Sequence, residues 1–126
     1  MIIDTLQQAR AAFDTCLEKK GRQVRLLGVG DLTIVADYFI VATVESAPQA
    51  AAMGRAVQEK LRDLAGRRAI GVEGQDSGWW VLVDYGDFVV HIFMAEAREY
   101  YAIDETWADA KIIAESEGEL RKAVGQ

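Results

Sequence analysis

The chain has 126 residues, of which 51% are hydrophobic and 27% are charged. This length and composition indicate one globular domain with a buried core and argue against a disordered chain. The net charge of −6 argues against a protein that holds nucleic acid mainly by charge, and it fits a partner that is itself basic.

Three sequence features bear on the compartment. No apolar run approaches the ~20 residues that a membrane helix needs, so no membrane contact is expected. The stretch MIIDTLQQAR at the start lacks the basic and apolar regions of a signal peptide, which favours the cytoplasm. Cys16 is the single cysteine, so it cannot form an internal disulfide and is expected to be a small buried core residue.

The first half of the chain predicts a helix, two strands and a second helix. Residues 4–20 carry apolar side chains at spacings of three and four, which is typical of an amphipathic helix. Strands are expected over residues 23–27 and 38–43, and the latter is nearly all apolar and therefore central in a sheet. Ser46 is expected to cap a second helix that runs to about Ala65.

The second half predicts further strands and a helical end. A short strand is expected over residues 69–72, and residues 78–93 are typical of a β-hairpin. The pattern turns helical over residues 96–101 and again from Asp104 onward. The strand–helix–strand segment of residues 38–72 suits a right-handed crossover, which joins parallel strands.

Together these elements predict an α/β fold, in which helices flank a mixed sheet of about five strands. The crossover supplies the parallel strands and the hairpin adds antiparallel pairing. We expect one domain over residues 1–112, followed by a polar tail over residues 113–126 that frays.

The hairpin is expected to close with a two-residue loop at Tyr85-Gly86, because glycine favours a tight turn. The cross-strand pairs are then Asp84 with Asp87, Leu82 with Val89, and Trp80 with His91. One side of the hairpin is uniformly apolar and is predicted to face the core. That side holds Trp79, Val81, Val83, Phe88, Val90 and Ile92.

The other side is mixed: it carries Trp80, Leu82, Asp84, Asp87, Val89, His91 and Phe93. Two opposed aspartates repel each other, and both would need partners if this side were buried. An open side would be an apolar patch with an aromatic anchor and an acidic end, which is typical of a binding surface. Alternatively, Trp80 and Phe93 pack under a helix and the aspartates merely flank a turn. The pattern alone favours neither interpretation.

The sequence carries no recognisable catalytic or metal motif. It has no GxxxxGK[ST] loop, no GxGxxG after a strand, and no second histidine or cysteine pair for zinc. We therefore expect no enzyme, no catalytic residue and no cofactor. One alternative stays open: Asp31, Asp37 and Asp84 lie near predicted strand ends and could bind Mg²⁺ for nucleotidyl or phosphoryl transfer, beside a weak glycine cradle at residues 28–30.

Two segments resemble the ribosomal silencing factor family, also called the Iojap-related proteins. Residues 31–43, DLTIVADYFIVAT, resemble its front motif. Residues 71–110 carry its Glu-Gly, Trp-Val-Leu-Val-Asp, Gly-Asp, Val-His and late Trp-x-Asp in order. Two departures are Tyr100-Tyr101 in place of Phe-Tyr, and Thr106 in place of a leucine.

The resemblance implies a nucleotidyltransferase-like fold without the catalytic motif, and a translational repressor. Family members bind the large ribosomal subunit through its protein number fourteen, a basic protein on the face that meets the small subunit. The bound factor blocks subunit joining sterically and lowers translation under nutrient limitation. Little direct RNA contact is expected, and self-association into a homodimer is implied as well.

The resemblance also implies roles for residues of the hairpin's mixed side. Trp80 would be the buried anchor at the ribosomal protein, and Asp84 would face a basic or hydrogen-bonding group. The patch would be completed by Tyr85, His91, Phe93 and Met94. Structural or supporting roles are implied for Glu73, Gly74, Gly86, Arg98, Tyr101 and Trp107.

Overall fold

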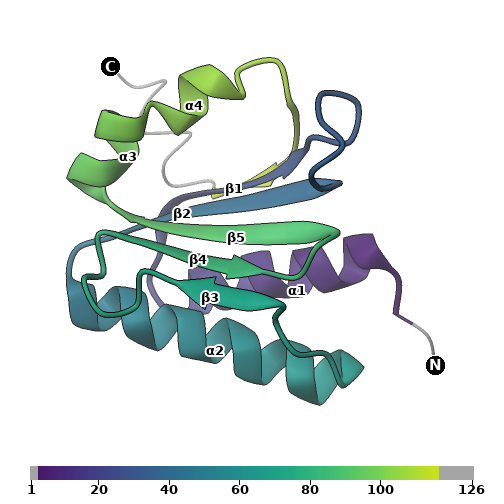
Figure 1. Ribbon diagram of the computed structural model, residues 1–126, viewed down its shortest axis with the longest axis horizontal. Helices are drawn as coiled ribbons and strands as arrows, with labels where there is room; N and C mark the ends of the chain where they lie inside the picture. Colours follow the sequence, from purple (N-terminus) through teal and green to yellow (C-terminus); the bar gives the residue numbers. More distant parts are fainter. Residues whose placement is uncertain (1–2, 117–126) are drawn as a thin grey trace.

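The computed structural model describes residues 3–116 as a six-stranded mixed sheet with helices on both faces (Figure 1). The strands are β1 (Arg22–Gly28), β2 (Tyr38–Val44), β3 (Gly71–Glu73), β4 (Trp80–Asp84), β5 (Phe88–Met94) and β6 (Lys111–Glu115). The helices are α1 (Thr5–Glu18), α2 (Ala47–Ala65), α3 (Ala95–Tyr101) and α4 (Ile103–Thr106). The predicted α/β class with a mixed sheet is confirmed, but the sheet has six strands rather than five.

Both long helices begin where the local sequence predicts, and α2 also ends there, whereas α1 ends at Glu18, two residues before the predicted end. The Asp4 carboxylate accepts a hydrogen bond from the Gln7 amide, and the Gln7 side chain accepts one from the Asp4 amide, which completes a capping box on α1. Ser46 caps α2 by accepting from the Gln49 amide at 3.1 Å. Gly66 ends α2 with φ of +62°, a conformation that favours glycine.

The strand order is β3-β4-β5-β2-β1-β6, and the one parallel pair of neighbours among these strands is β2 with β5. β2 and β3 run parallel, as the predicted crossover requires, but they are not neighbours, because the β4–β5 hairpin lies between them. Burial explains this order. Six of the seven residues of β5 are buried, so β5 takes a central position, whereas the short β3 is partly exposed and lies at the edge.

The segment after residue 104 is not a long helix. α4 ends at Thr106, and Lys111–Glu115 forms β6, which pairs antiparallel with β1. The boundary predicted after residue 112 falls inside this strand. β6 supplies hydrogen-bond partners to an edge of β1 that would otherwise be unpaired, and this pairing with a distant segment outweighs the helical pattern. The tail predicted to fray lies mostly outside the described residues.

Two hydrophobic layers hold the sheet. α1 and α2 cover one face, where side chains such as Phe13, Met53, Val81 and Phe88 are buried, and Cys16 lies there as predicted. α3 and α4 cover part of the other face, over Val41, Phe93 and their neighbours. Figure 1 shows the first pair of helices below the sheet and the second pair above it. Across residues 3–116, no helix has the length and apolar character needed to cross a membrane.

Candidate functional site

The β4–β5 hairpin is offset by two residues from the predicted register. The observed pairs are Trp80 with Phe93, Leu82 with His91, and Asp84 with Val89. The Tyr85 amide donates to the Phe88 carbonyl at 3.0 Å, so the turn centres on Gly86 and Asp87. Gly86 has φ of +89°, and its amide donates to the Asp84 carboxylate at 2.7 Å. The two-residue loop is therefore Gly86-Asp87 rather than Tyr85-Gly86, with the glycine at its first position.

The apolar side of the hairpin faces the core as predicted, with one exception. Five of its six residues are fully buried: Val81, Val83, Phe88, Val90 and Ile92. Trp79 precedes β4 and remains 38% exposed, so its assignment to the core is wrong. Alternation holds only where the strand is paired, and pairing with β5 begins at Trp80.

Asp87 does not belong to the mixed side. Its carboxylate accepts two hydrogen bonds from Arg67, at 2.6 and 3.1 Å, and one from the Thr5 hydroxyl at 2.9 Å. These partners belong to the α1/α2 face, so the predicted pair of opposed aspartates does not form. Burial alone raises the pKa of Asp87, but the hydrogen bonds from Arg67 and Thr5, together with the Arg67 charge, lower it below its usual value.

Asp87→Asn is expected to destabilise the fold by about 1–2 kcal/mol at pH 7, since it weakens a partly exposed, charge-assisted pair. A lowered folded-state pKa means that this contribution is present above the unfolded pKa of about 3.9 and is lost as pH falls through the folded pKa. Urea unfolding of wild type and variant should therefore differ at pH 7 and converge below about pH 3. Asp14→Asn, at an exposed position of α1, serves as the control; a gap that persists at low pH would contradict the assignment.

The mixed side divides into a covered half and an open half. Over β5, α3 and α4 bury Phe93, His91 and Val89. Over β4, the side chains of Trp80, Leu82 and Asp84 stay partly exposed. Phe93 is therefore buried as the covered interpretation predicts, whereas Trp80 stays partly exposed; a binding role for the open half stays a prediction. We call Trp80, Leu82, Asp84 and Glu73 the open face, because Glu73 of β3 lies directly opposite Leu82 and is exposed.

Trp80 is held in place by three neighbouring rings. Its indole N–H donates to His91 Nδ1 at 3.2 Å, and its ring lies 4.9 Å from the Phe93 ring and 4.6 Å from the Tyr101 ring between centroids. Burial lowers the pKa of His91 to about 4, although the charge of Asp84 raises it in part. His91 is thus neutral, and accepting at Nδ1 places its proton on Nε2. This histidine orients the tryptophan rather than acting as a base.

The structure separates the predicted contact residues by accessibility. Trp80, Asp84 and Met94 are partly exposed, so their side chains reach the surface. Phe93 and His91 are buried beneath them and can act only as supports. Tyr85 is 1% exposed and stacks on Phe88 within the opposite layer, so it cannot form part of the same patch. Leu82, which lies between the carboxylates of the open face, was missing from the predicted contacts and is identified by the observed register.

The supporting glycines are required by backbone geometry. Gly74 has φ of +83°, and a Cβ there would lie 1.9 Å from the Trp80 carbonyl oxygen. The close approach of residue 74 to the start of β4 is therefore possible only without a side chain. At Gly86, with its positive φ, a Cβ would also lie 2.9 Å from Ile70.

Arg98 joins α3 to the sheet. Its guanidinium donates twice to the Asp104 carboxylate at 2.9 Å, to the Gln23 carbonyl at 2.6 Å and to the Thr43 hydroxyl at 2.9 Å. The Asp104 pKa responds to this setting: burial raises it, but Arg98 and the Arg25 charge outweigh burial and lower it. Arg98 therefore supports the helix that carries Tyr101 to Trp80.

Trp107 follows α4 and packs edge-to-face on Phe39, with ring centroids 5.0 Å apart. It contributes to the hydrophobic layer beneath the two short helices. Trp107 thus has a structural role in the described chain.

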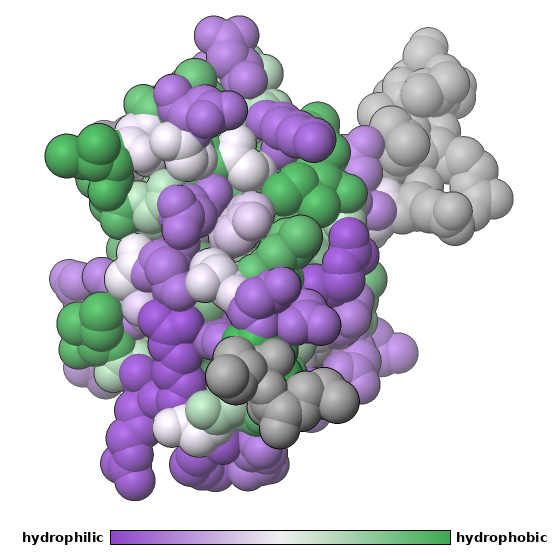
Figure 2. Space-filling model, turned by 90° about the vertical axis from the view of Figure 1, so that its right-hand side faces the viewer, coloured by the Kyte–Doolittle hydropathy of each residue, from purple (hydrophilic) through white to green (hydrophobic). Residues whose placement is uncertain are grey.

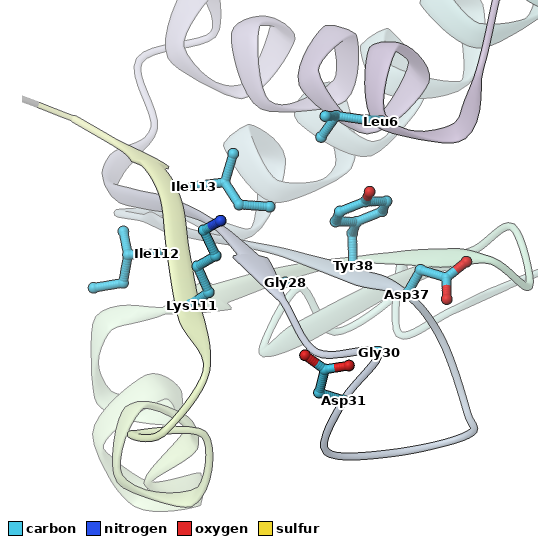
Figure 3. Close-up of a pocket in the computed structure, with 9 residues that line it drawn as sticks. All are labelled: Leu6, Gly28, Gly30, Asp31, Asp37, Tyr38, Lys111, Ile112 and Ile113. Carbon is cyan, nitrogen blue, oxygen red and sulfur yellow. The ribbon is translucent and has the colours of Figure 1, made fainter.

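The carboxylates proposed for metal-dependent transfer do not converge. Asp31 and Asp37 line a recess of about 570 Å³ with Lys111, Tyr38 and the glycines at residues 28 and 30, but Asp84 does not. Figure 3 shows the two aspartates on different parts of the loop between β1 and β2, with their carboxylates pointing in different directions. Within the described part of the chain, no three His, Cys, Asp or Glu side chains form a group that could hold a metal. The transferase alternative gains no support here.

Comparison with known proteins agrees with the sequence motifs. Residues 3–125 match the family model described as ribosomal silencing factor during starvation. The chain is 39% identical over 103 residues to the ribosomal silencing factor RsfS of Chromobacterium violaceum, which covers 82% of this chain and 84% of that protein. It is 34% identical over 103 residues to RsfS of Bacillus subtilis, with coverage of 82% and 86%.

A solved structure supports the same assignment. A crystal structure of a protein from C. violaceum superposes with a TM-score of 0.80 at 32% identity, covering 94% of this chain and 99% of that one. The family match extends beyond residue 112 and so includes β6, which the motifs alone left outside the shared pattern. The predicted resemblance is confirmed: this chain belongs to the ribosomal silencing factor family.

Proposed function

We propose that this chain is a cytoplasmic translational repressor that binds the large ribosomal subunit through ribosomal protein number fourteen. Membership of a family named for ribosome silencing during starvation supports the ribosome as its target. The observation that carries the proposed docking site is the open face, where Trp80 and Leu82 lie along β4, with Asp84 beyond Leu82 and Glu73 opposite it on β3. An apolar centre with an acidic rim complements a basic protein surface.

The open face is suited to an anchor-and-rim interface. Tryptophan is enriched among the few residues that carry most of the binding energy, and Trp80 is already held rigid by His91, Phe93 and Tyr101. Rigid anchors lose little conformational entropy on binding. An interface of about 800 Å² per partner is therefore sufficient for specific docking.

Silencing in this proposal needs no chemical step. A protein of 13.9 kDa seated on the face of the large subunit that meets the small subunit blocks joining by its volume alone. This accords with a family that is named for silencing rather than for a reaction. Self-association through the same exposed apolar residues would compete with ribosome binding, so a homodimer would be an inactive reserve.

The test is sedimentation of the chain with isolated large subunits through a sucrose gradient, followed by addition of small subunits. We expect wild type to travel with large subunits and to reduce the yield of joined ribosomes. Asp84→Asn keeps an acceptor for the Gly86 amide but removes the charge, and it is expected to bind about tenfold more weakly.

Asp14→Asn removes an equal charge from the exposed side of α1 and should bind like wild type. The proposal would be abandoned if wild type stayed at the top of the gradient at low salt. Equal binding by Asp84→Asn and wild type would show that the carboxylate of the open face takes no part in docking.

A further inference from the structure

A small basic recess lies where α2 meets the link to β3. It has a volume of about 240 Å³, and its lining residues are Gln58, Arg62, Arg67, Arg68 and Ala69. Three guanidinium groups thus surround one hollow in a chain whose net charge is −6. No sequence motif marks these arginines as a binding site, because they lie outside every recognised motif.

The three arginines differ in how far their charges are already satisfied. Arg67 is fully engaged: it bonds Asp87, the Gln8 side chain and the Tyr85 carbonyl, and it lies over two aromatic rings. Arg62 is exposed, and its nearest carboxylate, on Asp63, is 4.0 Å away. Arg68 is exposed, and its side chain makes no ion pair or hydrogen bond within residues 3–116. Two guanidiniums are therefore available to an external anion.

The recess lies on the α2 side of the sheet, and the segment that lines it continues into β3 beside the Asp84 end of the open face. The Ile70 amide donates to the Asp84 carbonyl at 2.7 Å, and Gly71 pairs with Asp84 across the β3–β4 ladder. Arg68 is two residues before Ile70, and β3 is an edge strand, so a partner that extends from the open face round this edge would meet the recess. In Figure 1 this link lies at the right-hand end of the molecule, below the β4–β5 turn. Figure 2 views that end, and hydrophilic residues dominate its lower part, whereas hydrophobic residues form separate patches.

We infer that this recess binds a backbone phosphate of ribosomal RNA when the chain is docked on the large subunit. The inference rests on the proposed function, which brings the chain to a particle rich in RNA. Guanidinium groups bind phosphate oxygens in pairs of parallel hydrogen bonds, and Arg62 and Arg68 both line the hollow. A hollow of about 240 Å³ accommodates a phosphodiester.

A basic recess also offsets the repulsion between this acidic chain and the RNA that surrounds the docking site. A chain with net charge −6 is repelled by RNA phosphates at long range, so docking on a ribosomal protein alone would be weakened by the surrounding RNA. A local basic site beside the acidic open face turns one neighbouring phosphate into a favourable contact. The expected result is a docking surface with two parts, of which one is acidic and apolar for protein and the other is basic for RNA.

The test measures affinity for large subunits at several salt concentrations, for wild type and for the double variant Arg62→Ala/Arg68→Ala. Each lost phosphate contact lowers the slope of log affinity against log salt by about 0.7–0.9, so the double variant, which loses one phosphate, should lose about that much from the slope. Its affinity at low salt should fall by about tenfold or more. Arg67 stays unchanged because it holds the turn of the hairpin.

A matched control removes two positive charges from α1 and its C-terminus with Arg10→Ala/Lys19→Ala, and it should leave the slope within about 0.5 of wild type. Arg62→Lys/Arg68→Lys keeps the charge but loses paired hydrogen bonding, so it should recover most of the slope and only part of the affinity. All variants are first shown to be folded by thermal unfolding.

The outcomes separate this inference from the proposed function. If the wild type binds subunits and the arginine double variant matches it in affinity and slope, docking stands and the RNA contact is wrong. If wild type does not bind, both fail. A titration with inorganic phosphate and with a 5′-nucleotide completes the test: tight, arginine-dependent binding of either one would identify a free small molecule, rather than RNA, as the ligand.

Discussion

Trp80→Ala is expected to weaken binding to the large ribosomal subunit by a factor of about 30 to 1,000, because truncating an aromatic anchor costs about 2–4 kcal/mol. The substitution removes the apolar centre of the open face and leaves Leu82 between two carboxylates without its neighbour. It also removes the N–H donor from His91 Nδ1, so the supporting rings lose their order. Fluorescence titration or sedimentation with large subunits measures the loss.

Two variants make this result specific. Trp79→Ala removes the adjacent tryptophan, which is exposed but precedes the paired strand, and it should keep near-normal affinity. Trp80→Phe retains an aromatic ring without the N–H donor and should fall between wild type and Trp80→Ala. A folded Trp80→Ala chain that binds as tightly as wild type would exclude the open face as the docking site.

Arg98→Ala is expected to destabilise the fold by about 3 kcal/mol, the lower part of the range for breaking a buried ion pair, since Asp104 keeps some contact with solvent. The loss leaves the Asp104 carboxylate, the Gln23 carbonyl and the Thr43 hydroxyl without their donor. In a domain of this size the melting temperature should fall by about 10 °C. Thermal unfolding followed by circular dichroism measures the shift.

Arg25→Ala is the matched control, because Arg25 contacts Asp104 at 3.4 Å and Glu115 at 3.3 Å from a more exposed position. Surface ion pairs of this kind contribute about 1 kcal/mol or less. If Arg98→Ala lowered stability no more than Arg25→Ala, the idea that Arg98 joins α3 to the sheet would be wrong. Loss of ribosome binding by Arg98→Ala below its melting temperature would further link α3 to the support of Trp80.

Part of the candidate site could be predicted from the alternation of side chains along the hairpin. The alternation of the hairpin assigned Trp80, Leu82 and Asp84 to one side and the buried valines to the other, and this assignment holds wherever the strands are paired. The same pattern placed Asp87 beside Asp84, which is wrong, because Arg67 and Thr5 draw its carboxylate to the helical face. Arg67 is 20 positions away from Asp87 along the chain, so no local pattern reveals the pair.

By itself the sequence determined the family, the N-terminal caps of α1 and α2, and the side of the hairpin that faces the core. These features depend on near-neighbour hydrogen bonds and on side-chain periodicity, which are visible in any short window of residues. The tertiary structure alone decided the strand order, the hairpin register, the existence of β6 and the division of the mixed side into covered and open halves. Each of these results from contacts between distant segments. β5 takes the central place beside β2, β6 completes the edge of β1, and Arg98 of α3 bonds Gln23 of β1 and Thr43 of β2. Trp80 therefore stays partly exposed, although Tyr101 at the end of α3 packs against it.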